Sequence, residues 1–218
     1  MGALRALSCF IRLQLNRRRY ATIGLLAMQL PTILSTEGAC ADVWDMGDGT
    51  VVKVFRRQAH TAAPPVEWDD HDFVTWLLAA VEKKAYERVR SDHELAAFVP
   101  EYFGAFDVQT LPPSPSGLSY INDAAFRIEK ISGEAIKIAC VPNPPQQEIE
   151  KVLERIAQVA GRVNVWDCSC FVPAPRGPFV VIDFAYPKDA LELSITLRDT
   201  GHLAPDLKQR VKLFANVA

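Results

Sequence analysis

The sequence predicts an α+β fold in which β-structure precedes the first long helix. Residues 33–55 contain apolar and alternating segments that are typical of strands, and Asp48-Gly49 is a hairpin signal between two of them. Residues 73–90 then space their apolar side chains as a helix does. Shorter strand-like runs and a second helical pattern follow, so sheet and helix are segregated along the chain.

Local signals justify the remaining elements in order. Asp69-Asp70 offers a start for the first helix, and the segments that separate elements are rich in proline or glycine. The predicted loops are residues 58–66 and 111–117. The further predicted strands are residues 99–106, residues 125–131 and an apolar run that ends at Asp183.

The second helix has the clearest pattern in the chain. Pro144-Pro145 opens it, Asn143 is a plausible cap and Gly161 a plausible terminator. Its apolar face consists of Ile149, Val152, Leu153, Ile156 and Ala160. A compact turn and strand over residues 162–172 follow it, and residues 191–197 and 206–214 could form one or two further helices.

Bulk composition excludes several classes of protein. The net charge of −2 gives no drive toward nucleic acid or membrane surfaces. No apolar run reaches the roughly 18 residues that a membrane span needs. Five cysteines without regular spacing favour a reducing, intracellular compartment, with the cytoplasm as the first choice. Cys168-x-Cys170 lacks the second ligand pair of a zinc site.

Residues 1–31 form a basic leader with no acid before Glu37. Leu4, Leu7 and Ile11 recur at helical spacing among the arginines. This composition is typical of a mitochondrial targeting segment, which would add a mitochondrial location to the alternatives. The other interpretations are a basic helix that packs on the following domain and a start codon assigned too early.

Three charged residues occupy unusual positions. Asp183 ends an apolar strand, where a carboxylate is well placed to hold a metal ion, and Lys53 lies inside the strand of residues 50–55. Glu82 lies in the apolar stripe of the first helix, which is costly without a partner. The alternatives are a solvent-facing Lys53 and a Glu82 whose long stem reaches water. A lysine, a helix acid and a later aspartate in this order are expected of a phosphoryl-transfer fold.

In this order the segments resemble the protein-kinase-like fold, including its aminoglycoside-phosphotransferase and small atypical relatives. Residues 38–43 resemble a reduced glycine-rich loop, and Val51-Val52-Lys53 resembles the nucleotide-binding lysine strand. Ile182-Asp183-Phe184-Ala185 stands where a DFG-type metal-binding motif is expected. The resemblance implies two lobes, an antiparallel-sheet lobe over residues 32–133 and a reduced, mainly helical lobe over residues 134–218.

The resemblance also implies ATP and Mg²⁺ as cofactors, because phosphoryl transfer depends on positioning and charge neutralisation. Lys53 would hold the α/β-phosphates, Glu82 would hold Lys53, and Asp183 would bind Mg²⁺. Backbone amides near Gly38 would cover the phosphates. The segment that contains Glu129 and Ile131 falls at the hinge, whose backbone would grip adenine.

The catalytic loop departs from the family pattern. Asn164 falls on the expected catalytic aspartate and Ser169 on the expected magnesium-binding asparagine. An amide cannot accept a proton as a carboxylate does, so Asn164 would lose the general-base role. Asp167 could replace it if the loop is rewired, although capping of local backbone amides is the more ordinary role for a turn aspartate.

Three functions therefore stay open. The first is a minimal or atypical ATP-dependent phosphotransferase with an unspecified acceptor. The second is a pseudokinase-type module that binds a protein partner without catalysis, favoured by Asn164, Ser169, Ala185 and the few residues after Asp183. The third is an unrelated α+β interaction protein. Nucleotide binding separates the third from the first two, and turnover separates the first from the second.

Overall fold

A computed structural model describes the chain in part. The described residues are 30–38, 40–57, 70–137, 140, 146–161, 163–164, 168–171, 179–183, 186–187, 193, 196, 199–206 and 209. The chain divides into two compact units, Met1–Leu30 and Pro31–Ala218, and all described residues except Leu30 belong to the second. Almost all of the predicted leader lies outside the described residues, as do most residues of the helices predicted at 191–197 and 206–214.

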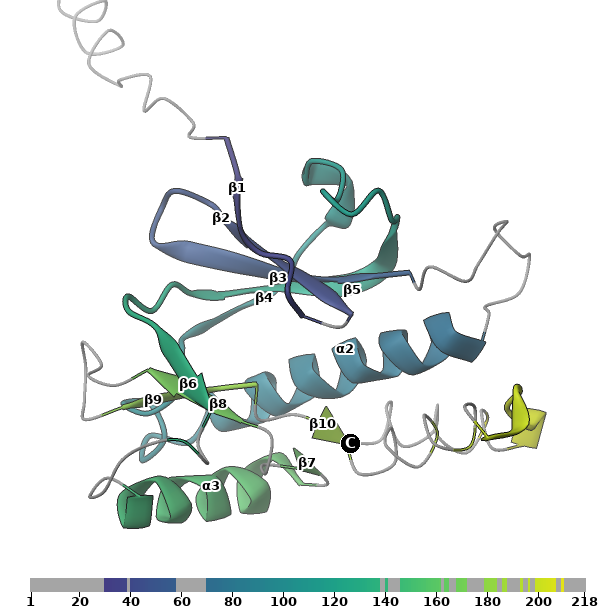
Figure 1. The fold of residues 1–218 in the computed structure, drawn as a ribbon. Coiled ribbons are helices and arrows are strands. Elements are labelled where there is room, and N and C mark those ends of the chain that lie inside the picture. Colours follow the sequence, from purple (N-terminus) through teal and green to yellow (C-terminus); the bar gives the residue numbers. More distant parts are fainter. Residues whose placement is uncertain are drawn as a thin grey trace, which may run out of the picture. The chain divides into compact units, whose positions relative to one another are not determined.

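A five-stranded antiparallel sheet forms the first part of this unit (Figure 1). Its strand order is β1-β2-β3-β5-β4. The strands are β1 (Thr32–Ser35), β2 (Ala41–Asp45), β3 (Thr50–Arg56), β4 (Tyr102–Ala105) and β5 (Tyr120–Glu129). Gly49 takes a φ of +83° in the turn between β2 and β3, where the sequence predicted a hairpin. The α+β prediction with an antiparallel sheet is confirmed.

Strand β5 begins at Tyr120, earlier than the predicted start at residue 125. Polar Asn122 and Asp123 interrupt its apolar pattern, and Asp123 has a φ of +59°. The pairing of β5 with β3 is irregular beside this point. An irregular strand of this kind gives no clean alternation in the sequence, which explains the late predicted start.

Helix α2 (Asp70–Val89) covers one face of the sheet (Figure 1). Asp70 and Asp72 lie in its first turn and Arg88 in its last, which suits the helix dipole. The Tyr86 ring packs between the rings of Phe126 and Tyr102, with centroid separations of 5.4 and 6.0 Å. Each such aromatic pair adds about 0.5–1.5 kcal/mol beyond the area it buries. These contacts fix the rotation of α2 against the sheet.

The opposite face of the sheet has its own small core. Trp44, Val52, Val54 and Ala125 pack there against Val108, which belongs to the short 3-10 helix η1 (Val108–Thr110). The chain between β4 and β5 therefore folds back over this face and removes it from water (Figure 1). Both faces of the central strands are buried as a result.

Helix α3 (Gln146–Ala160) buries the apolar face that the sequence predicted. It ends at Gly161, whose φ is +78°, and the Arg88 guanidinium donates to the Ala160 carbonyl at 2.8 Å. The accompanying strands are β6 (Ala135–Lys137), β7 (Val163–Asn164), β8 (Ser169–Phe171), β9 (Val180–Ile182) and β10 (Tyr186–Pro187). Strands β6, β8 and β9 form one sheet, and β7 pairs with β10. The described part of residues 134–218 thus combines α3 with short strands.

Candidate functional site

The site is built around the Lys53 ammonium group, on the face of the sheet that α2 covers. Its Nζ donates to both carboxylate oxygens of Glu82, at 2.9 and 2.8 Å, and to Oδ1 of Asp183 at 2.7 Å. Nζ also lies 5.4 Å from the centroid of the Phe55 ring. We call Lys53, Glu82 and Asp183 the inner cluster. The structure brings together three residues that the sequence predicted for one site.

Glu82 reaches Lys53 because of its place on α2. Its side chain is 8% exposed and that of Lys53 is 18% exposed, so the pair is largely shielded from water. Glu82 lies one turn before Tyr86, whose packing against the sheet sets the direction of this helix face. A buried carboxylate is tolerated when a cation satisfies it, which resolves the open interpretations of Glu82 and Lys53 in favour of a pair.

Asp183 enters the cluster from the end of β9 with an unusual backbone. Its φ is +57°, in the left-handed region that non-glycine residues rarely adopt. A hydrogen bond between the Asp183 backbone and Tyr86 connects this turn to α2. The Asp183 side chain is 43% exposed, in contrast to Glu82. Strained backbone held by its surroundings is common at functional sites.

The charges of the inner cluster depend on one another. Burial acts against the charge on Lys53, but Asp183 and Glu82 more than offset it and raise the pKa of Lys53 above its ordinary value. Lys53 lowers the pKa of the Asp183 carboxyl. Burial raises the pKa of Glu82, and Lys53 opposes this increase. With all three groups ionised, two carboxylates surround one cation and the cluster carries a net charge of −1.

The predicted phosphate-covering turn connects β1 and β2. A Cβ added to Gly38 would lie 2.9 Å from the Ala41 carbonyl oxygen, so this close approach requires glycine. Burial raises the pKa of the Cys40 thiol, and the charge of Lys53 is the largest influence that opposes it. The turn therefore lies within electrostatic reach of the inner cluster.

The predicted hinge residues follow the last strand of the large sheet. Glu129 is the final residue of β5, where its amide donates to the Glu101 carbonyl at 2.9 Å and its carboxylate accepts from the Glu101 amide at 3.2 Å. Ile131 is buried just beyond it. Between these two residues, the Lys130 amide donates to the Gly49 carbonyl at 2.9 Å. This segment leads directly into β6 and the smaller sheet.

The predicted catalytic and second metal positions are only partly described. Asn164 lies in β7 and pairs with Tyr186, three residues beyond Asp183, so the backbone of β7 runs beside the chain that follows Asp183. Ser169 is buried in β8 and pairs with Ile182, which directly precedes Asp183. Asp167 lies outside the described residues.

A second group of polar residues, which the sequence did not single out, lies on the opposite face of the sheet. Asp42 and Arg56 form a buried ion pair there, and Ser114 and Tyr120 donate hydrogen bonds to Asp42. We call these four residues the outer cluster. The available sequence signal was the presence of opposite charges near the paired ends of two apolar strands.

Among the described residues, no group of three or more histidine, cysteine or acidic side chains is arranged to hold a metal ion. No helix in the described part of the chain is both long and apolar enough to cross a membrane.

The arrangement of the three inner-cluster residues resembles the one found in protein-kinase-like folds. An antiparallel sheet carries a lysine bonded to an acid of the helix that covers it, and a later strand ends on an aspartate that reaches the same lysine. Kinases place their nucleotide-binding lysine, helix glutamate and metal-binding aspartate in this way.

Comparison with solved structures finds a crystal structure of Rio2 kinase from Chaetomium thermophilum, in an ADP/Mg²⁺-phosphoaspartate complex. The identity is 14%, the TM-score is 0.37, and the alignment covers 84% of this chain and 62% of that chain. This chain thus spans about three fifths of the kinase that it matches. No protein-family model and no curated protein matches the chain.

Proposed function

We propose that this chain is a kinase-like protein that binds ATP together with Mg²⁺. The observation that carries the proposal is the inner cluster, in which the Lys53 ammonium donates to three carboxylate oxygens of Glu82 and Asp183. Glu82 is the buried anchor and Asp183 the more exposed partner, so a ligand can compete for Lys53 on the Asp183 side. Lys53 would then hold the phosphates while Glu82 keeps it extended.

The donor set fits a magnesium nucleotide. Mg²⁺ is commonly held by one or two carboxylates together with phosphate oxygens, so it does not require a cage made of protein alone. Asp183 supplies such a carboxylate, and its lowered pKa keeps it ionised at neutral pH. Bound Mg²⁺ would neutralise charge between the phosphates and the cluster. Because the cluster alone is net negative, we expect ATP to bind weakly without a divalent cation.

Nucleotide binding is favoured over catalysis. The position predicted for the general base is Asn164, whose amide cannot take a proton from an acceptor hydroxyl. This observation favours the second candidate, a pseudokinase-type module that uses the nucleotide-bound fold to bind a protein partner. A phosphotransferase activity would need Asp167 or another group as base, and turnover of ATP in the presence of Mg²⁺ would distinguish the two.

A thermal-shift titration of the full chain with ATP, with and without Mg²⁺, tests the proposal. A ligand at a hundredfold excess over its Kd stabilises the folded state by about 2.7 kcal/mol, which is a clear increase in Tm. We expect the shift to require Mg²⁺ and to be lost in Asp183→Asn, which keeps the size of the side chain and tolerates the left-handed backbone.

Lys83→Met is the matched control, because Lys83 neighbours Glu82 on α2 but donates to the Asp123 carbonyl instead. Its shift with ATP and Mg²⁺ should equal that of the wild type. A wild-type protein without any shift would contradict the proposal and favour an unrelated α+β interaction protein. A shift that Asp183→Asn retains would place the nucleotide elsewhere.

A further inference from the structure

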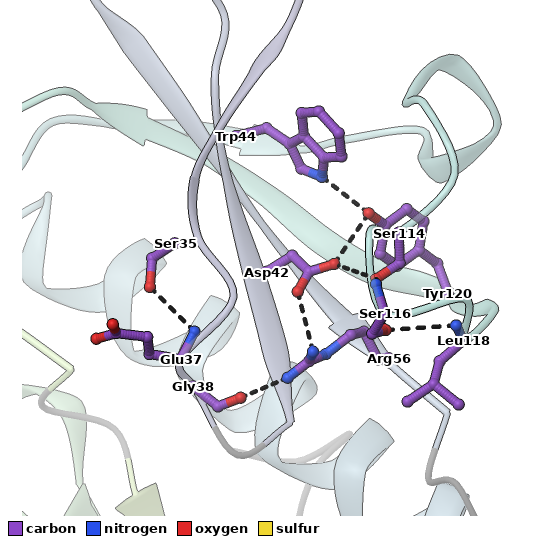
Figure 2. A network of polar contacts seen from close by, with 10 residues as sticks. All are labelled: Ser35, Glu37, Gly38, Asp42, Trp44, Arg56, Ser114, Ser116, Leu118 and Tyr120. Atoms are coloured by element: carbon purple, nitrogen blue, oxygen red, sulfur yellow. Dashed lines mark hydrogen bonds and ion pairs between the residues drawn. The ribbon is translucent and has the colours of Figure 1, made fainter.

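Arg56 connects the outer cluster to the turn between β1 and β2. It is the last residue of β3, and the strand alternation directs its side chain to the face opposite Lys53. The guanidinium Nη2 donates to the Gly38 carbonyl, while Nη1 lies 3.2 Å from Oδ1 of Asp42 (Figure 2). One buried arginine thus joins a fixed carboxylate to the predicted phosphate-covering turn.

The carboxylate end of this connection is held firmly. Asp42 is completely buried, and its Oδ2 accepts from the Ser114 hydroxyl at 2.6 Å and from the Tyr120 hydroxyl at 3.1 Å. The Trp44 indole donates in turn to the Tyr120 oxygen at 2.9 Å (Figure 2). Because these donors fix Asp42 from the sheet and from the β4–β5 connection, the planar guanidinium of Arg56 has a defined orientation.

At the turn between β1 and β2, Arg56 binds two backbone carbonyls. The Arg56 side chain binds the carbonyl of Gly38, and the Arg56 backbone amide donates to the carbonyl of Cys40 at 2.8 Å. The Ser35 hydroxyl also accepts from the Glu37 amide at 3.3 Å. Gly38 itself approaches Ala41 more closely than any residue with a Cβ could. Arg56 therefore binds the carbonyls of Gly38 and Cys40, which restrains the backbone of the turn at these two residues.

We infer that Arg56 is a positioning residue, which fixes the Gly38 turn from the far face of the sheet so that the turn can cover nucleotide phosphates. This inference rests on the proposed nucleotide-binding function. It assigns a role to a buried ion pair that lies on the other side of the sheet from Lys53. It also predicts that phosphate recognition, and not adenosine recognition, depends on Arg56.

The test compares Kd values of the full chain for ATP with Mg²⁺ and for adenosine, measured by calorimetry. Arg56→Lys keeps the charge beside Asp42 but lacks the planar fork that serves two acceptors at once. We expect its ATP affinity to fall about tenfold, equivalent to about 1.4 kcal/mol, with adenosine affinity changed by less than about twofold. If Arg56→Lys does not fold, the double variant Arg56→Met/Asp42→Asn, which removes both charges together, takes its place. It should show the same loss of ATP affinity and the same unchanged adenosine affinity.

Arg127→Met is the matched control. Arg127 pairs with Val52 across the sheet, on the outer face, but its guanidinium binds Asp48 in the turn between β2 and β3. Both affinities should stay unchanged in this variant. Equal losses for ATP and adenosine in Arg56→Lys would show a merely structural role, and unchanged ATP affinity would show that Arg56 does not position the turn. Either result overturns the inference.

A second readout does not need a nucleotide. Hydrogen exchange of the Glu37, Gly38 and Cys40 amides should be about tenfold faster in Arg56→Lys than in the wild type or in Arg127→Met. If the wild type binds no nucleotide, the proposed function fails while this measurement still decides the positioning role. Unchanged exchange at the turn would overturn the inference even if ATP binds.

Discussion

Lys53 and Arg56 belong to the same strand, and their side chains lie on opposite faces of the sheet. Each forms an ion pair with at least one carboxylate, yet the two clusters differ in exposure and charge. The inner cluster has two acids for one cation, and its Asp183 side chain is 43% exposed. The outer cluster has one acid for one cation, and the Asp42 and Arg56 side chains are 0% and 9% exposed.

The difference separates a cluster with a solvent-exposed acid from one that is buried. In the outer cluster, Ser114 and Tyr120 donate to one Asp42 oxygen and Arg56 lies beside the other, so the ion pair carries no net charge. In the inner cluster, Asp183 reaches solvent and the excess negative charge favours a cation. Buried ion pairs are weak evidence of stability in themselves, but removal of one partner is costly.

The largest expected effect is on the outer cluster. Arg56→Met would leave the Asp42 carboxylate buried without the cation that neutralises it, which should lower the free energy of unfolding by about 3–5 kcal/mol. Arg56→Met/Asp42→Asn should recover most of this loss, because an asparagine oxygen can still accept from Ser114 and Tyr120. Urea denaturation at pH 7 measures both variants. Equal stabilities for the single and the double variant would contradict the assignment of the cost to unpaired charge.

Removal of the inner-cluster cation should make the stability of the protein depend on pH. Lys53→Met removes the charge that opposes the raised pKa of Glu82, so the pKa of this carboxyl rises further. At pH values between the pKa of Glu82 in the unfolded state and its higher pKa in the folded state, the native protein holds one proton more than the unfolded protein. The free energy of unfolding therefore falls as pH rises, by up to about 1.4 kcal/mol per pH unit. Denaturation at about pH 5, 6 and 7 measures this slope.

Lys53→Met/Glu82→Gln is the control for this slope, because a glutamine cannot titrate. Both variants lack the Lys53 charge that lowers the pKa of Asp183, so any titration of Asp183 is common to the two and the difference in slope reports Glu82. A Lys53→Met variant whose stability changes with pH no more than that of the double variant would show that Glu82 reaches water or another cation.

The smallest expected effect is the loss of the exposed acid. Asp183→Asn should lower stability at pH 7 by less than about 1 kcal/mol, because partial exposure screens the pair with Lys53. The pKa of Asp183 is lowered in the folded state, so its contribution is present above the unfolded pKa and is lost as pH falls through the folded pKa. The two proteins should therefore converge in acid. A loss as large as that of Arg56→Met would contradict the distinction between the clusters.

The sequence by itself determined the elements with regular patterns. The apolar face of α3, the turn at Asp48-Gly49 and the strand of Lys53 all follow from local spacing and turn chemistry. Glu82 in an apolar stripe indicated a buried partner because an isolated buried carboxylate is too costly. The order of lysine, helix acid and late aspartate, together with the resemblance to the protein-kinase-like fold, then predicted that these three residues share one site.

Only the tertiary structure decided the rest. Asp42 and Arg56 have the charge pattern of solvent-facing strand residues, and they are buried because the distant chain between β4 and β5 folds over that face. The left-handed backbone of Asp183 likewise depends on its surroundings, which include Tyr86 and Lys53. Local patterns report which residues prefer burial, whereas the partners that make a buried charge tolerable come from segments far apart in the chain.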